Sequence, residues 1–122
     1  MTEGRFRFGP EARIRAHKEF QRPFREGRKF AGRSAILWTC RRSAQDVSGA
    51  RLGLSVSVKL GTAVRRNRLK RLAREAFRLS RARLRPESDL ILYLRPGCRW
   101  EHLRDAERDL EELCRKAGLI QE

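Results

Sequence analysis

The sequence KLGTAVRRNRLKRLAREAFRLSRARLR occupies residues 59–85, and from residue 65 onward it holds ten Arg or Lys residues against one acid, Glu75. On an α-helix, which turns by about 100° per residue, its apolar and polar residues separate onto opposite sides. Thr62 suits an N-cap and Pro86 ends the pattern, so we expect one helix between them. The apolar side carries Leu69, Leu72, Ala73, Ala76, Phe77 and Ser80, and the opposite side carries Asn67, Arg71, Arg74 and Arg78, flanked by Arg68 and Lys70.

Like charges recur along this helix at the spacing of one turn. Solvated helices usually place opposite charges at i and i+4, whereas here Lys70, Arg74 and Arg78 follow one another at that spacing. Each like-charge pair costs roughly a few tenths of a kcal/mol. A solvated face without a partner is the alternative for any basic helix, but a bound polyanion would relieve this repulsion. We therefore interpret the cationic side of this helix as a binding surface.

The composition limits the chain to one domain and indicates a polyanionic partner. With 122 residues, of which 39% are hydrophobic, we expect a single modest core built from one sheet with helices on it. The formal net charge is +15, and 25 of the 30 basic residues are Arg, whose planar guanidinium binds phosphate in a bidentate manner. Such a surface attracts phosphate backbones, and salt screens the attraction.

Several classes of site find no support in the sequence. Cys40, Cys98 and Cys114 are widely spaced without a CxxC pair, so we expect reduced thiols in a cytoplasmic protein and neither disulfides nor a zinc site. No apolar run approaches the ~18 residues of a membrane span and no signal peptide opens the chain, so we expect no membrane partner. His17 and His102 have no acid–serine or acid–cysteine constellation near them, and the acids do not cluster as a metal-dependent nuclease requires. The polypeptide is predicted to bind rather than to catalyse.

The remaining segments predict an α/β arrangement around the basic helix. Residues 1–12 contain two Gly, a Pro and no periodicity, and we interpret them as a mobile basic arm before one domain at 13–118 and a tail at 119–122. Within the domain we expect a helix at 13–27, strands at 28–32, 34–40, 51–59 and 89–95, a loop at 41–50, and a helix at 101–117.

The strands at 51–59 and 89–95 define the expected sheet. In the first, an aliphatic row alternates with a small, hydroxylic row that ends in a charge. The second row is Gly53, Ser55, Ser57 and Lys59. The strand at 89–95 is almost continuously apolar, as expected for a central or parallel strand buried on both faces. A strand, a helix and a strand in sequence predict a βαβ crossover, which is right-handed by default.

Three aromatic residues have two possible roles. Phe20 and Phe24 are i,i+4 neighbours on the first helix, where core packing is the simpler interpretation. Trp38, on the second strand, suits either core packing or a platform on which bases stack. The pattern of the residues leaves both roles open.

The sequence GLSVSVKLGTAVRRNRLKRLAREAFR, residues 53–78, resembles the characteristic motif of the bacterial ribonuclease P protein component, the small basic subunit that assists a catalytic RNA in maturing transfer RNA 5′ ends. The family pattern runs from Ser-Lys-Lys through Gly-Asn-Ala-Val to Arg-Asn-Arg-x-Lys-Arg and Arg-Glu-x-Phe-Arg. The sequence KEFQRPFREG, residues 18–27, resembles the family's first helix, and with DLILYLRPG the resemblance covers about residues 13–115. The motif is matched at Gly61, Ala63, Val64, Arg66, Asn67, Arg68, Lys70, Arg71, Arg74, Glu75 and Phe77.

The resemblance implies a specific α+β fold. The family has the element order αβββαβα in a two-layer sandwich, with a four-stranded sheet related to a domain of a ribosomal small-subunit protein. Its βαβ crossover is left-handed, so on the resemblance the left-handed connection replaces the right-handed default.

The resemblance also implies two sites for RNA and no catalytic or metal-binding residue on the protein. One site would bind the ribonuclease P RNA, and a cleft between the first helix and the sheet would bind the 5′ leader of precursor tRNA. Hydrolysis would depend on Mg²⁺ held mainly by the RNA, and no protein homo-oligomer is required. Implied contacts to the RNA subunit are Arg65, Arg66, Asn67, Arg68, Lys70, Arg71, Arg74 and Arg78. Implied contacts to the leader are Arg13, Phe20, Phe24, Arg33, Trp38, Ser55, Ser57 and Lys59.

Two positions depart from the family pattern. Val58 stands where the family usually has the first Lys of its pair, and Thr62 stands where it usually has Asn. A ribosomal-type protein that binds structured RNA without a role in cleavage is the alternative function. A DNA-binding protein has weaker support, because no helix-turn-helix pair or dimerisation heptad is present, and a self-sufficient nuclease has the least.

Overall fold

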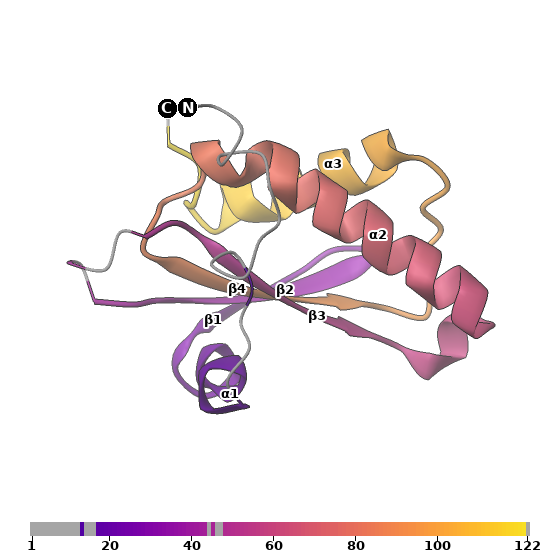
Figure 1. Ribbon diagram of the computed structural model, residues 1–122, viewed down its shortest axis with the longest axis horizontal. Coiled ribbons are helices and arrows are strands. Elements are labelled where there is room, and N and C mark those ends of the chain that lie inside the picture. Colours follow the sequence, from indigo (N-terminus) through magenta and orange to yellow (C-terminus); the bar gives the residue numbers. More distant parts are fainter. Residues whose placement is uncertain (1–12, 14–16, 44, 46–47, 122) are drawn as a thin grey trace.

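The computed structural model describes residues 13, 17–43, 45 and 48–121, with the backbone alone for residues 17–20. The arm predicted at residues 1–12 lies outside this part of the chain. The main elements occur in the predicted order αβββαβα (Figure 1). They are α1 (His17–Glu26), β1 (Arg28–Ala31), β2 (Ala35–Arg41), β3 (Arg51–Val56), α2 (Ala63–Ser80), β4 (Ser88–Leu94) and α3 (Leu103–Lys116), and the short 3₁₀ helices η3 (Val58–Leu60) and η4 (Arg81–Arg83) flank α2.

The four strands form one mixed sheet in the order β1-β2-β4-β3. β2 pairs with β1 and β4 in antiparallel fashion, and β3 pairs with β4 in parallel, so the apolar strand β4 is central as predicted. The chain passes from β3 through α2 to β4, which confirms the expected βαβ unit. The left hand of this crossover stays a prediction from the resemblance.

The helices divide between the two faces of the sheet. Figure 1 shows α2 and α3 together over one face and α1 beneath the other. Because side chains alternate along a strand, Leu37 of β2 and Leu92 of β4 face α2 and α3, where they join a core that includes Phe77. Trp38 of β2 points to the opposite face and meets Phe24 of α1. This division places the two predicted RNA sites on different sides of the protein.

The strand predicted at 51–59 ends earlier, and this prediction was wrong at its last three residues. β3 stops at Val56, and the Ser57 hydroxyl accepts a hydrogen bond from the backbone N–H of Lys59, capping η3. Val58 is therefore 75% exposed instead of continuing the buried aliphatic row. Gly61 then turns the chain into α2. Its φ of 112° is a backbone conformation that residues with a side chain disfavour.

The start of the basic helix agrees with the prediction, whereas its end and the end of the chain differ from it. The Thr62 hydroxyl accepts from the backbone N–H of Arg65 at 3.2 Å, as expected of an N-cap. Regular helix ends at Ser80, where η4 begins. The predicted tail is instead partly folded, because Leu119 is buried and Ile120 forms a β-bridge with Leu84. Among the described helices, none is long and apolar enough to cross a membrane.

Candidate RNA interfaces

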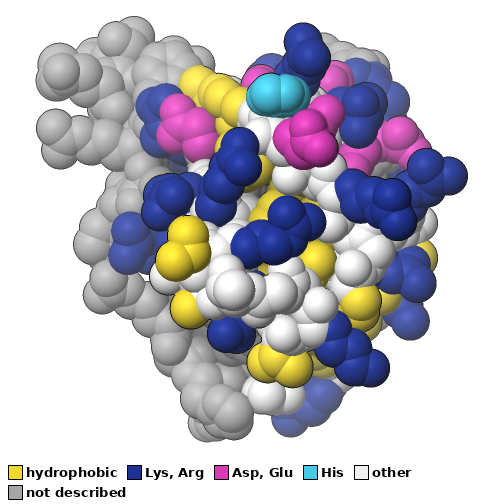
Figure 2. All heavy atoms as spheres, turned by 90° about the vertical axis from the view of Figure 1, so that its right-hand side faces the viewer, with side chains coloured by type: hydrophobic (Ala, Val, Ile, Leu, Met, Phe, Trp, Pro, Cys, Tyr) yellow, Lys and Arg dark blue, Asp and Glu magenta, His cyan; other side chains and the backbone are white. Residues whose placement is uncertain are grey.

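The predicted division of α2 into two sides is confirmed. Its buried residues are Leu69, Ala73, Ala76 and Phe77, which hold the helix on the sheet and against α3. Arg65, Asn67, Arg68 and Arg71 are exposed, and Arg66, Lys70, Arg74 and Arg78 are half-buried. Figure 2 shows the end of the molecule at which α2 begins, where Lys and Arg side chains spread over the face and acidic side chains gather along one edge. We call Asn67, Lys70, Arg71 and Arg74 the α2 outer side.

Two arginines near the start of α2 that belong to the predicted RNA-subunit site bind backbone carbonyls of the protein. Arg68 Nη2 donates to the carbonyl of Glu101 at 2.6 Å, and Arg65 Nη2 donates to the carbonyl of Cys98 at 3.5 Å. Both carbonyls belong to the segment between β4 and α3, so these arginines tie the start of α2 to it. A guanidinium has five N–H donors, so each retains donors for a ligand.

Arg78 forms an ion pair with Glu75 one turn earlier, with Nη2 and Oε2 2.5 Å apart. The hydrogen bond from Arg78 lowers the pKa of Glu75, so the single acid of α2 stays ionised at neutral pH. In the part of the chain that the structure describes, no hydrogen bond or ion pair engages the side chains of the α2 outer side. Those side chains are the ones best placed to meet a polyanion.

Arg66 differs from its neighbours in having a buried polar atom without a partner. Its Nε is buried and finds no acceptor among the described residues, although the residue as a whole is half-buried. An unsatisfied buried donor costs about 1–3 kcal/mol.

The opposite face carries a partly exposed aromatic pair. The rings of Phe24 and Trp38 have centroids 4.8 Å apart and are tilted by 60°. Phe24 is 38% exposed, and the Lys29 ammonium lies 5.6 Å from the centroid of the Trp38 ring. Two aromatic surfaces beside a cation suit single-stranded nucleic acid. Its bases stack on aromatic rings, and its anionic phosphates are attracted to the cation. Phe20 lies on α1, and its side chain is outside the described part of the structure.

The sheet register places further residues on this same face. Lys29 is opposite Trp38, Trp38 is opposite Ile91, and Ile91 is opposite Gly53, so the four form one row across the sheet. Ser55 lies one row further along, beside Tyr93. Lys29 and Tyr93 were absent from the predicted site, because their positions depend on strand register, which the sequence does not reveal. Gly53 adds no side chain to this row and is itself buried.

The other predicted leader contacts are more scattered. Ser57 is buried and its hydroxyl caps η3, whereas Ser55 is half-buried on β3. Lys59 is exposed on η3, and exposed Arg13 forms a parallel β-bridge with Leu52. Arg33 lies in the turn between β1 and β2, where it borders a hollow with residues of α3 rather than the aromatic pair.

The described cysteines and acids do not form a reactive centre. Cys40, Cys98 and Cys114 are free thiols, and burial raises the pKa of Cys114 to about 12. A thiol with so high a pKa stays protonated and is a poor nucleophile or metal ligand. No group of three His, Cys, Asp or Glu that fits a metal ion occurs among the residues described.

Comparison with known proteins gives one consistent family. The family model described as ribonuclease P matches residues 8–118. The ribonuclease P protein component of Clostridium acetobutylicum is 36% identical over 111 residues, which cover 90% of this chain and 92% of that protein. That of Dictyoglomus thermophilum is 36% identical over 124 residues, covering 98% of each chain.

Solved structures have the same fold. The ribonuclease P protein of Staphylococcus aureus superposes with a TM-score of 0.78 at 32% identity, over 90% of this chain and 98% of that one. The protein from Thermotoga maritima gives a TM-score of 0.71 at 29% identity, over 84% and 96% of the two chains.

Proposed function

The chain belongs to the ribonuclease P protein family, and on this premise we propose that it assists a catalytic RNA in removing the 5′ leader of precursor transfer RNA. It is a protein component of ribonuclease P, the endoribonuclease that matures transfer RNA 5′ ends. The alternative of a ribosomal-type RNA-binding protein is not favoured, because the match to the ribonuclease P family extends over residues 8–118.

The observation that supports the proposal is that two surfaces with different chemistry, one cationic and one aromatic, lie on opposite faces of one sheet. The α2 outer side is cationic and lies over one face, and the Phe24–Trp38 pair lies on the other. We infer that a protein with this arrangement is suited to bind two RNA segments at once. In the proposed complex these are the RNA subunit and the precursor leader.

We propose that the α2 outer side binds the RNA subunit through its phosphates. Arg71 and Arg74 lie on adjacent turns and point away from the core formed by Leu69 and Phe77. Guanidinium groups bind phosphate oxygens with two parallel hydrogen bonds. The net charge of +15 adds a long-range attraction that speeds association at low salt.

We propose that the aromatic face binds the leader. Stacking on an aromatic ring contributes about 1–3 kcal/mol per base and accepts any base, which suits a leader of variable sequence. Lys29 and Lys59 would neutralise leader phosphates near the aromatic pair and at the end of β3.

The chemistry is proposed to reside in the RNA, with Mg²⁺ ions held mainly there. Two described carboxylates are engaged in the fold itself, since Asp89 pairs with Arg42 and Arg51, and Asp109 accepts from the Trp100 indole. They do not fit a metal cluster, so the protein would contribute binding energy and relief of phosphate repulsion. The free cysteines suit the cytoplasm as the compartment.

The test is cleavage of precursor transfer RNA at low Mg²⁺ by a bacterial ribonuclease P RNA, with and without the protein. Strong stimulation is expected, and the double variant Arg71→Ala, Arg74→Ala should lose most of it. Arg68 is a less suitable target, because its bond to Glu101 supports the fold. A control that removes two exposed cations elsewhere, Arg83→Ala with Lys116→Ala, should retain stimulation. Absence of stimulation by the unmodified protein would refute the proposed function.

A further inference from the structure

A hollow of about 640 Å³ lies at the end of the molecule where α3 terminates, away from the start of α2. It is bounded by the last turn of α1, the end of β2, the start of β4 and the residues after α3, and none of its described lining residues belongs to α2. Four arginines and one buried serine line it: Arg22, Arg28, Arg41, Arg85 and Ser88. We call it the α1–α3 hollow.

Two of these arginines are bound to the end of α3. Arg28 Nη2 donates to the carbonyl of Ala117 at 2.8 Å, and Arg85 Nε donates to the carbonyl of Gly118 at 2.9 Å. The C-terminal end of a helix carries partial negative charge. Arg28 and Arg85 offset this charge where it would otherwise repel an anion.

The other two arginines are fixed on the opposite wall. Arg22 Nη2 donates to the carbonyl of Arg41 at 2.6 Å, and Arg41 Nη2 lies 2.7 Å from Glu87 Oε2. A backbone hydrogen bond and the bond from Arg41 lower the pKa of Glu87, so it counts as a full negative charge at neutral pH. Glu87 lies behind Arg41 and does not line the hollow, and among the described lining residues Glu26, which pairs with Arg22, is the one acid. Four cations against two anions leave the site positive.

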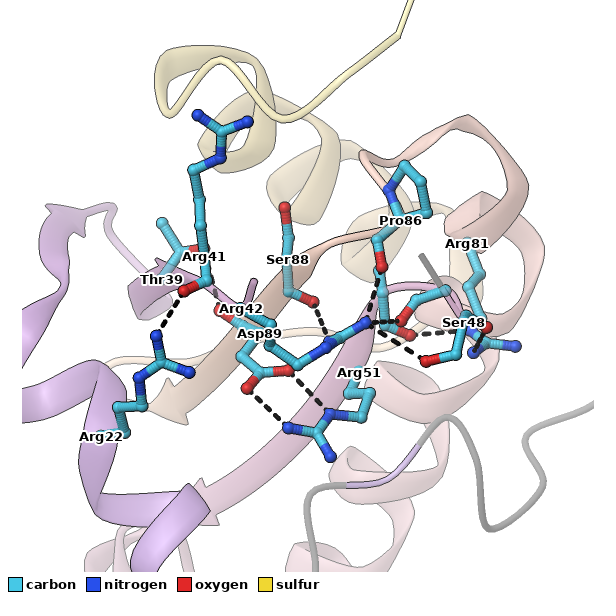
Figure 3. A network of polar contacts seen from close by, with 12 residues as sticks. Arg22, Thr39, Arg41, Arg42, Ser48, Arg51, Arg81, Pro86, Ser88 and Asp89 are labelled. Carbon is cyan, nitrogen blue, oxygen red and sulfur yellow. Dashed lines mark hydrogen bonds and ion pairs between the residues drawn. The ribbon is translucent and has the colours of Figure 1, made fainter. Parts of the chain in front are cut away.

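Ser88 supplies an independent sign that a ligand belongs here. The residue is 0% exposed, and its hydroxyl has no hydrogen-bond partner among the described residues, although it lines the hollow. Its backbone carbonyl, in contrast, accepts from Arg42. Figure 3 shows the hydroxyl pointing away from the Arg42–Asp89 contacts, on the side to which the Arg41 guanidinium also points. Buried hydroxyls are seldom left unpaired, because the free energy lost on removing them from water is then not offset by a hydrogen bond within the protein.

We propose that the α1–α3 hollow binds a phosphate group, with the Ser88 hydroxyl donating to one oxygen and arginine N–H groups donating to the others. A phosphate offers several acceptor oxygens at once, and arginines already held by backbone carbonyls lose little freedom on binding it. The volume exceeds that of one phosphate and admits a phosphodiester with an attached sugar. The source is either the RNA partner, in which case the inference rests on the proposed function, or free inorganic phosphate.

The first experiment titrates the full-length protein with inorganic phosphate and follows backbone amide shifts by NMR. Saturable shifts at Ser88 and Gly118 are expected, and Ser88→Ala should weaken their apparent affinity about tenfold through loss of one bond to an anion. Because the hydroxyl has no partner in the fold, this variant should unfold at the same or a higher urea concentration than the unmodified protein. Ser80→Ala, a serine on α2, serves as the control. Shifts that persist unchanged in Ser88→Ala would overturn the proposal.

The second experiment identifies the source of the phosphate. Binding to the ribonuclease P RNA is measured against salt for Arg41→Gln and for Arg83→Gln, a cation outside the hollow with the same charge loss. If an RNA phosphate occupies the hollow, only Arg41→Gln lowers the slope of log K against log salt, by about 0.7–0.9. Equal slopes together with weakened inorganic phosphate binding in Arg41→Gln support free phosphate as the ligand. Equal slopes with unaltered phosphate binding would overturn the site, and cleavage stimulation by the unmodified protein reports on the proposed function separately.

Discussion

At the scale of single residues, Asp89 is the side chain around which one end of the sheet is assembled. It is 0% exposed, Arg42 Nη1 lies 2.5 Å from its Oδ1, and Arg51 donates to both of its oxygens at 2.8 Å (Figure 3). Arg42 also donates to the carbonyls of Gly49 and Pro86. Asp89 therefore joins β4, β3 and the loop after β2. A buried charge is stable only when it is paired and hydrogen-bonded in this way.

Asp89→Asn is expected to destabilise the protein by about 3 kcal/mol, because it leaves the buried Arg42 and the half-buried Arg51 without their anion. Urea unfolding followed by circular dichroism measures the change. The control is Glu112→Gln, which removes a carboxylate paired at 3.7 Å with exposed Lys116 and should cost less than about 0.5 kcal/mol. Similar stabilities for the two variants would mean that the buried pair contributes no more than a surface one.

Phe24→Ala is expected to weaken leader binding about tenfold while leaving affinity for the RNA subunit unchanged, because the ring is 38% exposed beside Trp38. Equilibrium binding of precursor transfer RNA with and without its leader separates the two effects. Phe24→Tyr retains the aromatic face and should restore affinity. If Phe24→Ala lowers only the unfolding temperature, the residue is simply core.

The residues of the fold were easier to predict than those of the sites. Leu69, Ala73 and Phe77 follow from helical periodicity alone, and the structure buries all three. Lys29 was missed because only strand register brings it to Trp38. The unpaired Ser88 hydroxyl was missed because burial and hydrogen-bond partners do not leave a sequence pattern.

At the scale of elements, local capping chemistry explains where the periodicity failed. Alternation predicted a strand as far as Lys59, but the Ser57 hydroxyl and Gly61 favour a turn, and the chain bends after Val56. The bend directs α2 back across the sheet toward β4, so the basic helix owes its position to these few residues. The crossover itself was predictable, because a strand, a helix and a strand follow one another in the sequence.

The connection between α1 and β1 depends on the close approach of two backbone carbonyls to Gly27. A Cβ added there would lie 2.3 Å from the carbonyl oxygen of Thr39 and 2.5 Å from that of Pro23. Gly27→Ala should therefore displace α1 from β2 and cost about 1–3 kcal/mol in urea unfolding. Gly97→Ala, whose Cβ would meet the carbonyl of Arg33 at an ordinary 3.7 Å, is the control and should be nearly neutral. If Gly27→Ala leaves the stability unaltered, the backbone between α1 and β1 accommodates the added methyl group without cost.

At the scale of the whole molecule, charge is distributed unevenly around one sheet. The segment 51–99 holds 14 basic residues against three acids, whereas the segment 101–117, which contains α3, holds six acids against four bases. Composition alone predicted a phosphate-bearing partner, and helical periodicity placed the α2 outer side. The separation of the two proposed RNA-binding faces required the fold, because it depends on α1 and α2 packing on opposite sides of the sheet (Figure 1).

The salt dependence of binding to the RNA subunit decides whether net charge or the α2 outer side governs that binding. A charge of +15 attracts any polyanion, so loss of any two cations weakens binding somewhat. Direct binding of phosphates releases counterions as well, and Arg71→Ala with Arg74→Ala should therefore reduce the slope of log K against log salt by about 0.7–0.9 for each phosphate that is no longer bound. Arg83→Ala with Lys116→Ala removes the same charge from side chains paired with α3 acids and should leave the slope almost unchanged. Equal reductions in both double variants would assign the affinity to overall charge and remove the special role of α2.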